Sequence, residues 1–379
     1  MQRIYLDHNA TTPLRPDVAE AMAGALREEL GNPSSVHAEG AAARARVEMA
    51  RSRIAAFLQA PEASIRFTSG ATESNNTVLL GLLEPGDHVV TTLVEHPSVL
   101  APLAWLEERG VEVTRLSPGS DGCVDAATVA AALEARTKLV SMIWANNETG
   151  AIQPIPEVAA LCAARGIALH VDATQAVSRI PVDLSRVPID FLSASAHKLG
   201  GPKGVGALVS RRPQEAPVWL RGGAQERGRR GGTENVLGIV GFGVACAQAE
   251  RDMGERIERH AKLRDRLWQG IRTGIEDVRW NGDPDRTLPN TLNVEFRGVA
   301  GEVLLQALDL EGVSVSAGAA CHSGSIEPSA VLLAMGRTRE EARGSLRFSV
   351  GEGVDDGQIE RVVALLRDLV PRIRRAEAP

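Results

Sequence analysis

The sequence predicts an α/β fold, in which a large domain is built around a mostly parallel central sheet and a smaller α+β domain follows. Short apolar runs at residues 87–92, 139–144 and 167–171 are typical of buried strands, and amphipathic Ala- and Leu-rich stretches separate them. Strands and helices that alternate at this spacing favour a parallel sheet. After about residue 235 the pattern changes to a long helical stretch and then to a mixed arrangement.

Taken in order, the first part of the chain predicts strands alternating with helices. The expected strands are at 65–67, 87–92, 111–116, 139–144, 167–171 and 190–193, with helices at 125–134 and 155–164. The second part predicts a helix over 235–274, a strand at 291–296, a helix at 301–310, a strand at 345–350 and a helix at 356–374. We therefore expect a large domain over 12–250 and a small domain over 251–379, joined by the N-terminal segment 1–11.

Composition excludes several classes of protein. The chain has 379 residues, of which 44% are hydrophobic and 24% charged, so it is neither disordered nor collagen-like. A net charge of −6 argues against a nucleic-acid-binding protein, and no apolar run approaches the ~20 residues of a membrane span. The first residues show no targeting leader. The cysteines form no Cys-x-x-Cys pair, which fits a reducing cytoplasm.

A glycine turn after the first expected strand is a candidate phosphate-binding site. The run Thr68-Ser-Gly70 ends the strand, and Ala71-Thr72 begins a helix. Free backbone N–H groups and the positive end of a helix dipole attract an anion at such a position. By itself, the pattern more often marks an ordinary capped helix.

Two further candidate residues follow expected strands. Asp172 comes directly after the buried run 167–171, where open α/β sheets bind ligands, although a structural salt bridge or a helix N-cap explains it equally well. Lys198 follows the next strand and precedes a Gly-rich turn. A surface lysine is the commonest explanation, but a lysine among small residues at a strand end is easily desolvated and can form a Schiff base.

Together, these three features match the requirements of pyridoxal 5'-phosphate. Its phosphate needs a helix N-terminus, its pyridine nitrogen an acidic partner and its aldehyde an amine. With these residues the chain resembles the fold-type I pyridoxal-phosphate enzymes related to class-V aminotransferases, and among them the cysteine desulfurases of the NifS/IscS family. The motifs that carry the resemblance are Tyr5–Pro13, Gly31–Ser35, Phe67–Asn76, Glu95–Pro97, Asn146–Gly150, Ser195–Lys198, Gly201–Gly204, Gly232–Asn235, Ala320–Cys321, Glu327–Ser329 and Ser345–Ser349.

The resemblance implies a role for each matching residue. Lys198 is expected to hold the cofactor and to act as the base at the substrate's α carbon. Asp172 is expected to pair with the ring nitrogen and Gln175 with the phenolic oxygen. His96 is expected to stack on the ring and shuttle protons, and Asn147 to lie beside the ring and the substrate. The residues implied at the phosphate are Ala71, Thr72, Ser195 and His197, with Thr233 reaching the phosphate bound in the neighbouring subunit of an obligate homodimer.

Cys321 and Arg347 carry the implied reaction. Arg347 is expected to bind the substrate carboxylate, since guanidinium binds a carboxylate in bidentate fashion. Cys321 lies in a run of small residues, which disfavours burial, whereas Cys123, Cys162 and Cys246 are expected to be ordinary buried cysteines. The resemblance implies that Cys321 takes the sulfur of L-cysteine as a persulfide and leaves L-alanine. It also implies delivery to an iron–sulfur scaffold protein or to sulfur carriers for tRNA and cofactor thiolation, with Cys321 as a transient iron–sulfur ligand.

The sequence departs from the family pattern near that cysteine. Ala317 and Ala319 replace serines, His322 replaces a small hydroxyl residue, and Ala224 interrupts a turn that is usually all glycine. These changes bear on loop kinetics and on the pKa of the thiol. Two other hypotheses stay open at this point. One is a selenocysteine lyase or another aminotransferase-like enzyme, and the other is a non-catalytic sulfur-relay protein.

Overall fold

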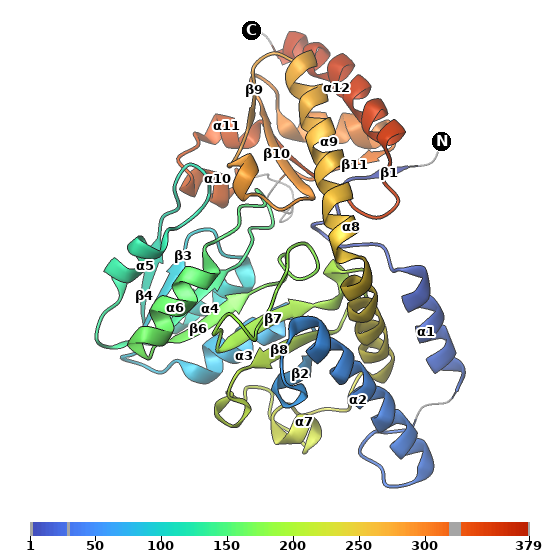
Figure 1. The fold of residues 1–379 in the computed structure, drawn as a ribbon. Helices are drawn as coiled ribbons and strands as arrows, with labels where there is room; N and C mark the ends of the chain where they lie inside the picture. Colours follow the sequence, from blue (N-terminus) through green and yellow to red (C-terminus); the bar gives the residue numbers. More distant parts are fainter. Residues whose placement is uncertain (1–2, 29–30, 318–326, 378–379) are drawn as a thin grey trace.

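The computed structural model of the chain describes residues 3–28, 31–317 and 327–377, and shows a large α/β body beside a smaller one (Figure 1). In the described residues, the large body has a seven-stranded sheet in the order β2-β8-β7-β6-β5-β3-β4. Strand β8 runs antiparallel to β2 and β7, whereas the other neighbours pair in parallel. The strands are β2 (Ile65–Thr68), β3 (His88–Thr92), β4 (Glu112–Leu116), β5 (Thr137–Ile143), β6 (Ala168–Asp172), β7 (Phe191–Ser195) and β8 (Gly206–Ser210).

Helices cover both faces of this sheet because its strands are apolar on both sides. In β3, Val89 packs in one hydrophobic cluster with residues of α3 (Ala71–Leu82) and α4 (Pro97–Glu107). Val90 packs in another cluster with residues of α2 (Ala38–Leu58), α6 (Ile155–Arg165) and α8 (Val236–Gly274). Successive side chains of a strand point to opposite faces, so this alternation is expected of a buried parallel sheet. The remaining helices of the large body are α1 (Pro16–Arg27), α5 (Ala126–Ala132) and α7 (Gln225–Gly228).

The smaller body is built on an antiparallel sheet. Strands β12 (Ser345–Ser349), β10 (Thr291–Phe296) and β9 (Val278–Trp280) pair in that order, and α9 (Gly301–Leu310) and α12 (Asp356–Glu377) pack in the same hydrophobic cluster. Strand β1 (Ile4–Tyr5) pairs in parallel with β11 (Val313–Ser314), so the N-terminal segment joins this body. Helices α10 (Ala330–Ala334) and α11 (Arg339–Arg343) instead pack with Val94 and Ile143 of the large body.

Helix α8 connects the two bodies. Its 39 residues form one continuous helix, which passes from the large body to the smaller one (Figure 1). Phe242 and Ala249 belong to the cluster of the large body, whereas Leu263 and Ile271 belong to that of the smaller body. The expected boundary between residues 250 and 251 falls inside this helix, and the division into 12–250 and 251–379 stays a prediction.

The expected elements at 235–274, 291–296 and 301–310 are found to within one residue. Strands β8 and β9 are not among the expected elements, because β8 is a run of 5 residues that begins with a glycine and β9 has only 3 residues. No helix in the described part of the chain is long and apolar enough to cross a membrane.

The carboxyl ends of the parallel strands bring distant parts of the chain to one edge of the sheet. Asp172 ends β6, and Lys198 follows β7. His96 follows β3, and Asn147 follows β5. Open α/β sheets bind their ligands at this edge.

Candidate active site

Asp172 is a buried carboxylate that neutral groups hold in place. The residue is 2% exposed. Its Oδ2 accepts a hydrogen bond from Asn75 Nδ2 at 2.8 Å, and its Oδ1 accepts one from the backbone N–H of Thr174 at 3.0 Å. Among the residues that the structure describes, none forms an ion pair with Asp172. A buried carboxylate calls for a cationic partner, so this position suits a protonated ring nitrogen.

Lys198 supplies the amine. It lies in the 3-10 turn Ala196–Lys198 after β7, and its Nζ donates to the backbone carbonyls of Asn9 at 2.5 Å and Ala10 at 2.8 Å. Burial, followed by the charges of Arg179 and Arg347, lowers the pKa of Lys198 to about 7. A large fraction of the molecules therefore carries an unprotonated amine at neutral pH, which is the form that attacks a carbonyl.

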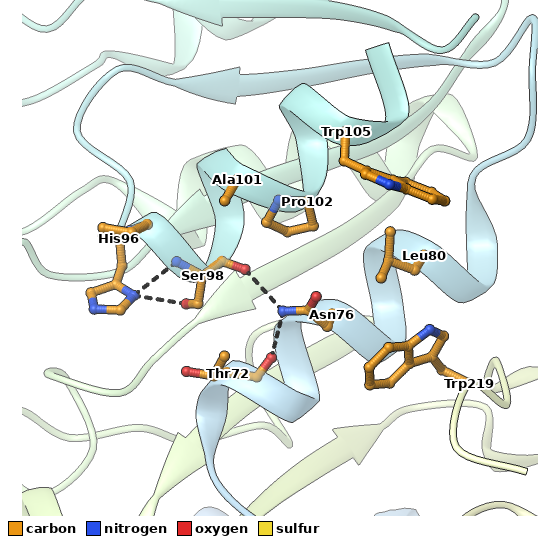
Figure 2. A pocket seen from close by; sticks show the side chains of 10 residues that line it. Thr72, Asn76, Leu80, His96, Ser98, Ala101, Pro102, Trp105 and Trp219 are labelled. Carbon is orange, nitrogen blue, oxygen red and sulfur yellow. Dashed lines mark hydrogen bonds between the residues drawn. The ribbon is translucent and has the colours of Figure 1, made fainter. Parts of the chain in front are cut away.

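His96 is oriented through its Nδ1 atom. The residue caps the N-terminus of α4, where Nδ1 accepts a hydrogen bond from the backbone N–H of Ser98 at 3.1 Å. Because Nδ1 accepts, the proton of the neutral ring is on Nε2, which points away from Ser98 (Figure 2). Burial lowers the pKa of His96, so the neutral ring dominates at neutral pH.

A chain of hydrogen bonds joins His96 to Asp172. Asn75 Nδ2 donates to Ser98 Oγ at 2.8 Å as well as to Asp172. Ser98 Oγ, in turn, lies 2.8 Å from His96 Nδ1 and can donate to it. Asn75 is fully buried, so one amide fixes two residues that come from different elements, α4 and β6.

Gln175 is held with its donor group toward the N-terminal segment. Its Nε2 donates to the carbonyl of Asn9 at 3.0 Å, the same carbonyl that Lys198 contacts. Its Oε1 accepts from Arg179 Nη1. An amide has one acceptor end and one donor end. Because the guanidinium of Arg179 occupies the acceptor Oε1, the donor Nε2 is the end of Gln175 on the side of Lys198.

Of the residues expected around a phosphate, Ala71 and Thr72 begin α3, and Ser195 lies beside Gly70, which precedes the helix. No side chain caps this helix at Gly70, and a Cβ placed on Gly70 would lie 3.7 Å from Ser195 Oγ. Ala71 is buried and Thr72 is exposed. His197 Nδ1 lies 3.1 Å from Thr11 Oγ1, and burial lowers the pKa of His197 to about 4. Neutral donors around a helix N-terminus suit a phosphate.

Arg347 approaches the site from β12 of the smaller body. It is 4% exposed, and it donates through Nη1 to the carbonyl of Asn147 at 2.8 Å and through Nη2 to Asp7 Oδ1 at 2.6 Å. Its Nε is buried and has no hydrogen-bond partner among the described residues. The structure thus brings Arg347 beside Asn147 and leaves a guanidinium donor available for a carboxylate.

A pocket of about 760 Å³ opens beside His96 and Thr72 (Figure 2). Its wall is mostly apolar, and Trp105 and Trp219 are 48% and 44% exposed there. An apolar surface of this kind is typical of an interaction site. The other residues that line it are Asn76, Leu80, Pro97, Ser98, Ala101 and Pro102.

Thr233 does not line the pocket beside His96 and Thr72. It is exposed and lines a separate pocket, which it shares with Thr68 and Ser69. Thr68 and Ser69 directly precede Gly70 at the N-terminus of α3, so this pocket adjoins the expected phosphate site.

Cys321 lies outside the described residues, but both flanks of its segment are anchored near Arg347. Ser316 and Arg347 exchange backbone hydrogen bonds of 3.1 and 2.7 Å. Ser329 Oγ donates at 2.5 Å to Oε2 of Glu148, the residue that follows Asn147. The covalent path to Cys321 thus starts and ends beside the expected substrate site.

The other three cysteines are free and buried, as expected. Burial raises the pKa of Cys123 and of Cys162 to about 12, and it raises the pKa of Cys246 well above its ordinary value. Thiols with such pKa values are weak nucleophiles at neutral pH.

Sequence reasoning missed four residues that hold the site together, namely Asp7, Asn75, Ser98 and Arg179. Asn75 lies in the motif Phe67–Asn76, so a signal existed, but its contact with Asp172 joins residues 97 positions apart. A buried arginine such as Arg179 leaves no sequence signal, because arginine is ordinarily exposed.

Comparison with known proteins shows the family of the chain. The aminotransferase class-V family model matches residues 4–362. The chain belongs to the class-V aminotransferase family. A cysteine desulfurase from Nostoc sp. is 44% identical over 377 residues, which cover 99% of this chain and 94% of that relative.

Two solved structures of related proteins show the same fold. A NifS-like protein superposes with a TM-score of 0.91 at 34% identity, covering 98% of this chain and 100% of that chain. SspA in complex with cysteine superposes with a TM-score of 0.81 at 33% identity, covering 92% and 99%. The resemblance to the NifS/IscS cysteine desulfurases and the expected fold class are thereby confirmed.

Proposed function

We propose that this class-V family member is a cysteine desulfurase that uses pyridoxal 5'-phosphate. It converts L-cysteine and the thiol of Cys321 into L-alanine and a persulfide on Cys321. The observation that carries the proposal is a pair of residues at one edge of the sheet. Asp172 is a buried carboxylate that forms no ion pair with another described residue, and Lys198 is an amine with a lowered pKa. The names of the relatives support it.

The residues present fit the cofactor. The unpaired carboxylate of Asp172 suits a pyridinium nitrogen, and the uncapped N-terminus of α3 with Ser195 suits the phosphate. Lys198 would hold the aldehyde carbon, with Gln175 as donor to the phenolic oxygen and His96 and Asn147 beside the ring. When bound, the cofactor supplies an electron sink that stabilises negative charge at the substrate's α carbon.

The side chains of this protein then bind the substrate and move protons. Arg347 binds the carboxylate of L-cysteine, and its unpartnered Nε supports this role. Lys198 Nζ is basic enough to take the α proton at neutral pH, because its pKa is about 7. His96 carries a proton on Nε2 and can exchange it with the reacting groups.

The short stretch of chain between Ser316 and Cys321 supports Cys321 as the sulfur acceptor. Cys321 follows by five residues the pairing of Ser316 with Arg347, and five extended residues span at most roughly 17 Å. Attack of its thiolate on the sulfur of L-cysteine forms the S–S bond and breaks the C–S bond. The released carbon gains a proton and leaves as L-alanine, so no external oxidant or reductant is needed.

We further propose a homodimer in the cytoplasm. The exposed tryptophans of the pocket in Figure 2 and the exposed position of Thr233 support a neighbouring subunit that contributes to the site. Free thiols support a reducing compartment. The persulfide would go to an iron–sulfur scaffold protein or to a sulfur carrier, with Cys321 as a transient cluster ligand. Nucleic acid and membrane are not expected partners.

The test is incubation with L-cysteine, followed by measurement of alanine and mapping of the persulfide by mass spectrometry. We expect stoichiometric persulfide on Cys321 in a single turnover and no alanine from Cys321→Ala. Cys162→Ala is the matched control and should keep full turnover, because that thiol is buried.

A Lys198→Ala variant separates an enzyme from a sulfur relay. The purified protein should show a visible absorption band that borohydride bleaches and that this variant lacks. Alanine formation that survives Cys321→Ala unchanged, or a persulfide on another cysteine, would contradict the proposal.

A further inference from the structure

A second, smaller cavity of about 40 Å³ lies where the N-terminal segment, α8 and the chain after β12 meet. Four basic side chains line it, namely Arg15, Arg179, Lys198 and Arg256. Among its lining residues the one carboxylate is Glu352. Lys198 is shared with the candidate active site, whereas Asp172, His96, Gln175 and Asn147 do not line this cavity.

The positive charge around this cavity is not balanced by neighbouring carboxylates. Arg179 is 5% exposed and donates only to uncharged groups, including the carbonyl of His8 at 2.9 Å. In the described part of the chain it forms no ion pair. Arg256 pairs with Asp252 at 3.2 Å, but Arg15 pairs with the same carboxylate. Burying charge without a counter-ion is strongly unfavourable.

Among the described residues, Glu352 pairs with Arg15 and not with Arg179. Its side chain is 50% exposed, and its carboxylate lies 3.9 Å from Arg15, beyond hydrogen-bond distance. The guanidinium of Arg179 therefore has no acid to face inside the cavity.

His260 gives an independent indication of a ligand. This residue of α8 is 7% exposed and lines the cavity, and its Nε2 has no hydrogen-bond partner in the described residues. Burial, followed by the charges of Arg256 and Arg179, lowers the pKa of His260 to about 3, so the ring is neutral. Buried polar atoms almost always have a partner, and an orphan one calls for a bound water or ion.

We propose that this cavity binds a small inorganic monovalent anion of the size of chloride or bromide, held by Arg179, Arg256 and the Nε2–H of His260. The volume exceeds the ~10–15 Å³ that one water requires, and it is far below the ~300 Å³ or more of pockets for organic ligands. Guanidinium groups are the side chains best suited to an anion in a buried site.

The anion would connect parts of the protein that meet at this point. Arg179 follows β6 in the large body, and Arg256 and His260 are on α8, which runs between the two bodies. A bound anion neutralises the surplus charge at this junction. Because it binds the folded chain only, it stabilises that state in proportion to its occupancy.

The test combines diffraction and solution measurements on the purified full-length protein, with and without pyridoxal phosphate. Crystals grown in sodium bromide should show an anomalous bromide peak among Arg179, Arg256 and His260. In solution, bromide and chloride should raise the melting temperature in a saturable way relative to gluconate at the same ionic strength.

Variants link this effect to the cavity. His260→Phe keeps the ring shape but removes the donor, and we expect the apparent bromide affinity to fall about tenfold or more, because a hydrogen bond to an ion is lost. Arg179→Met should have the same or a larger effect. Arg251→Met, at an exposed position of the same helix, is the matched control and should bind bromide like the unmodified protein.

Three results would overturn the proposal. One is an ordered water without anomalous signal in the cavity. Another is a melting temperature that follows ionic strength whichever anion is present. The third is a peak that His260→Phe leaves unchanged, which would mark an adventitious ion only. None of these results bears on the sulfur chemistry, so the two proposals succeed or fail separately.

Discussion

Asn75 donates a hydrogen bond of 2.8 Å to Oδ2 of Asp172. The same Nδ2 atom donates to Ser98 Oγ, which contacts His96. One buried amide therefore sets the position of Asp172, which is expected to pair with the cofactor's ring nitrogen. Through Ser98 it also sets the orientation of His96, which is expected to stack on the cofactor ring.

The first prediction concerns this amide. Asn75→Ala should weaken the binding of pyridoxal phosphate about 10- to 100-fold, because a hydrogen bond to a charged group contributes about 1.5–3 kcal/mol. A spectrophotometric titration of the cofactor-free protein measures this affinity. In the control Asn76→Ala, the lost amide contacts only the carbonyls of Thr72 and Ser98, so affinity should change less than about threefold. Equal losses in both variants would contradict a specific role for Asn75.

The second prediction concerns the pH dependence of cofactor capture. Only the unprotonated amine of Lys198 attacks the aldehyde, and its pKa is about 7 instead of 10.5. Raising the pH increases the fraction of free amine, so the capture rate should rise between about pH 6 and 8 and then level off. Stopped-flow absorbance of the cofactor-free protein measures the rate. A rate that continues to rise up to about pH 10 would show that Lys198 keeps an ordinary pKa.

Part of the site could be predicted from the sequence, namely the residues that follow the expected strands of the sheet. The neighbourhood of Asp172 and Lys198 could be predicted, because each follows an expected strand and the carboxyl ends of parallel strands share one edge. The role of α8 could be predicted only in part. Its length is visible in the sequence, but the change from one hydrophobic cluster to the other between Met253 and Leu263 depends on tertiary packing.

Contacts between distant segments could not be predicted. The pairing of Arg347 with Asp7 depends on the N-terminal segment, in which β1 pairs with β11 and Asp7 bridges to Ser349 of β12; β1 and β11 are 2 residues long each. Such short strands have too little periodicity to be recognised. Arg179 is buried only because carbonyls and Gln175 surround it, and the identity of neighbouring residues along the chain does not specify that environment.

The third prediction concerns the substrate carboxylate. Arg347→Lys should raise the KM for L-cysteine about 10- to 100-fold, because lysine cannot provide the two parallel donors of a guanidinium. The visible band of the bound cofactor should persist. Steady-state alanine formation measures KM, with the exposed Arg343→Lys on α11 as control. An unchanged KM would assign the carboxylate to another residue.

The last prediction concerns Ser329, which both caps α10 and anchors the segment after Cys321. Its Oγ accepts from the backbone N–H of Leu332 at 3.1 Å and donates to Glu148 Oε2 at 2.5 Å.

Thr338 caps α11 in a similar way but has no contact with Glu148, so Thr338→Ala reproduces the loss of a cap, at about 1 kcal/mol of stability. Ser329→Ala should lose a similar stability and, in addition, slow persulfide formation on Cys321 about tenfold, because a hydrogen bond to a buried carboxyl is lost. Single-turnover mass spectrometry of Cys321 compares the two variants at equal cofactor occupancy. If both slow the reaction equally, the effect is one of helix stability alone, and the contact with Glu148 does not position the cysteine segment.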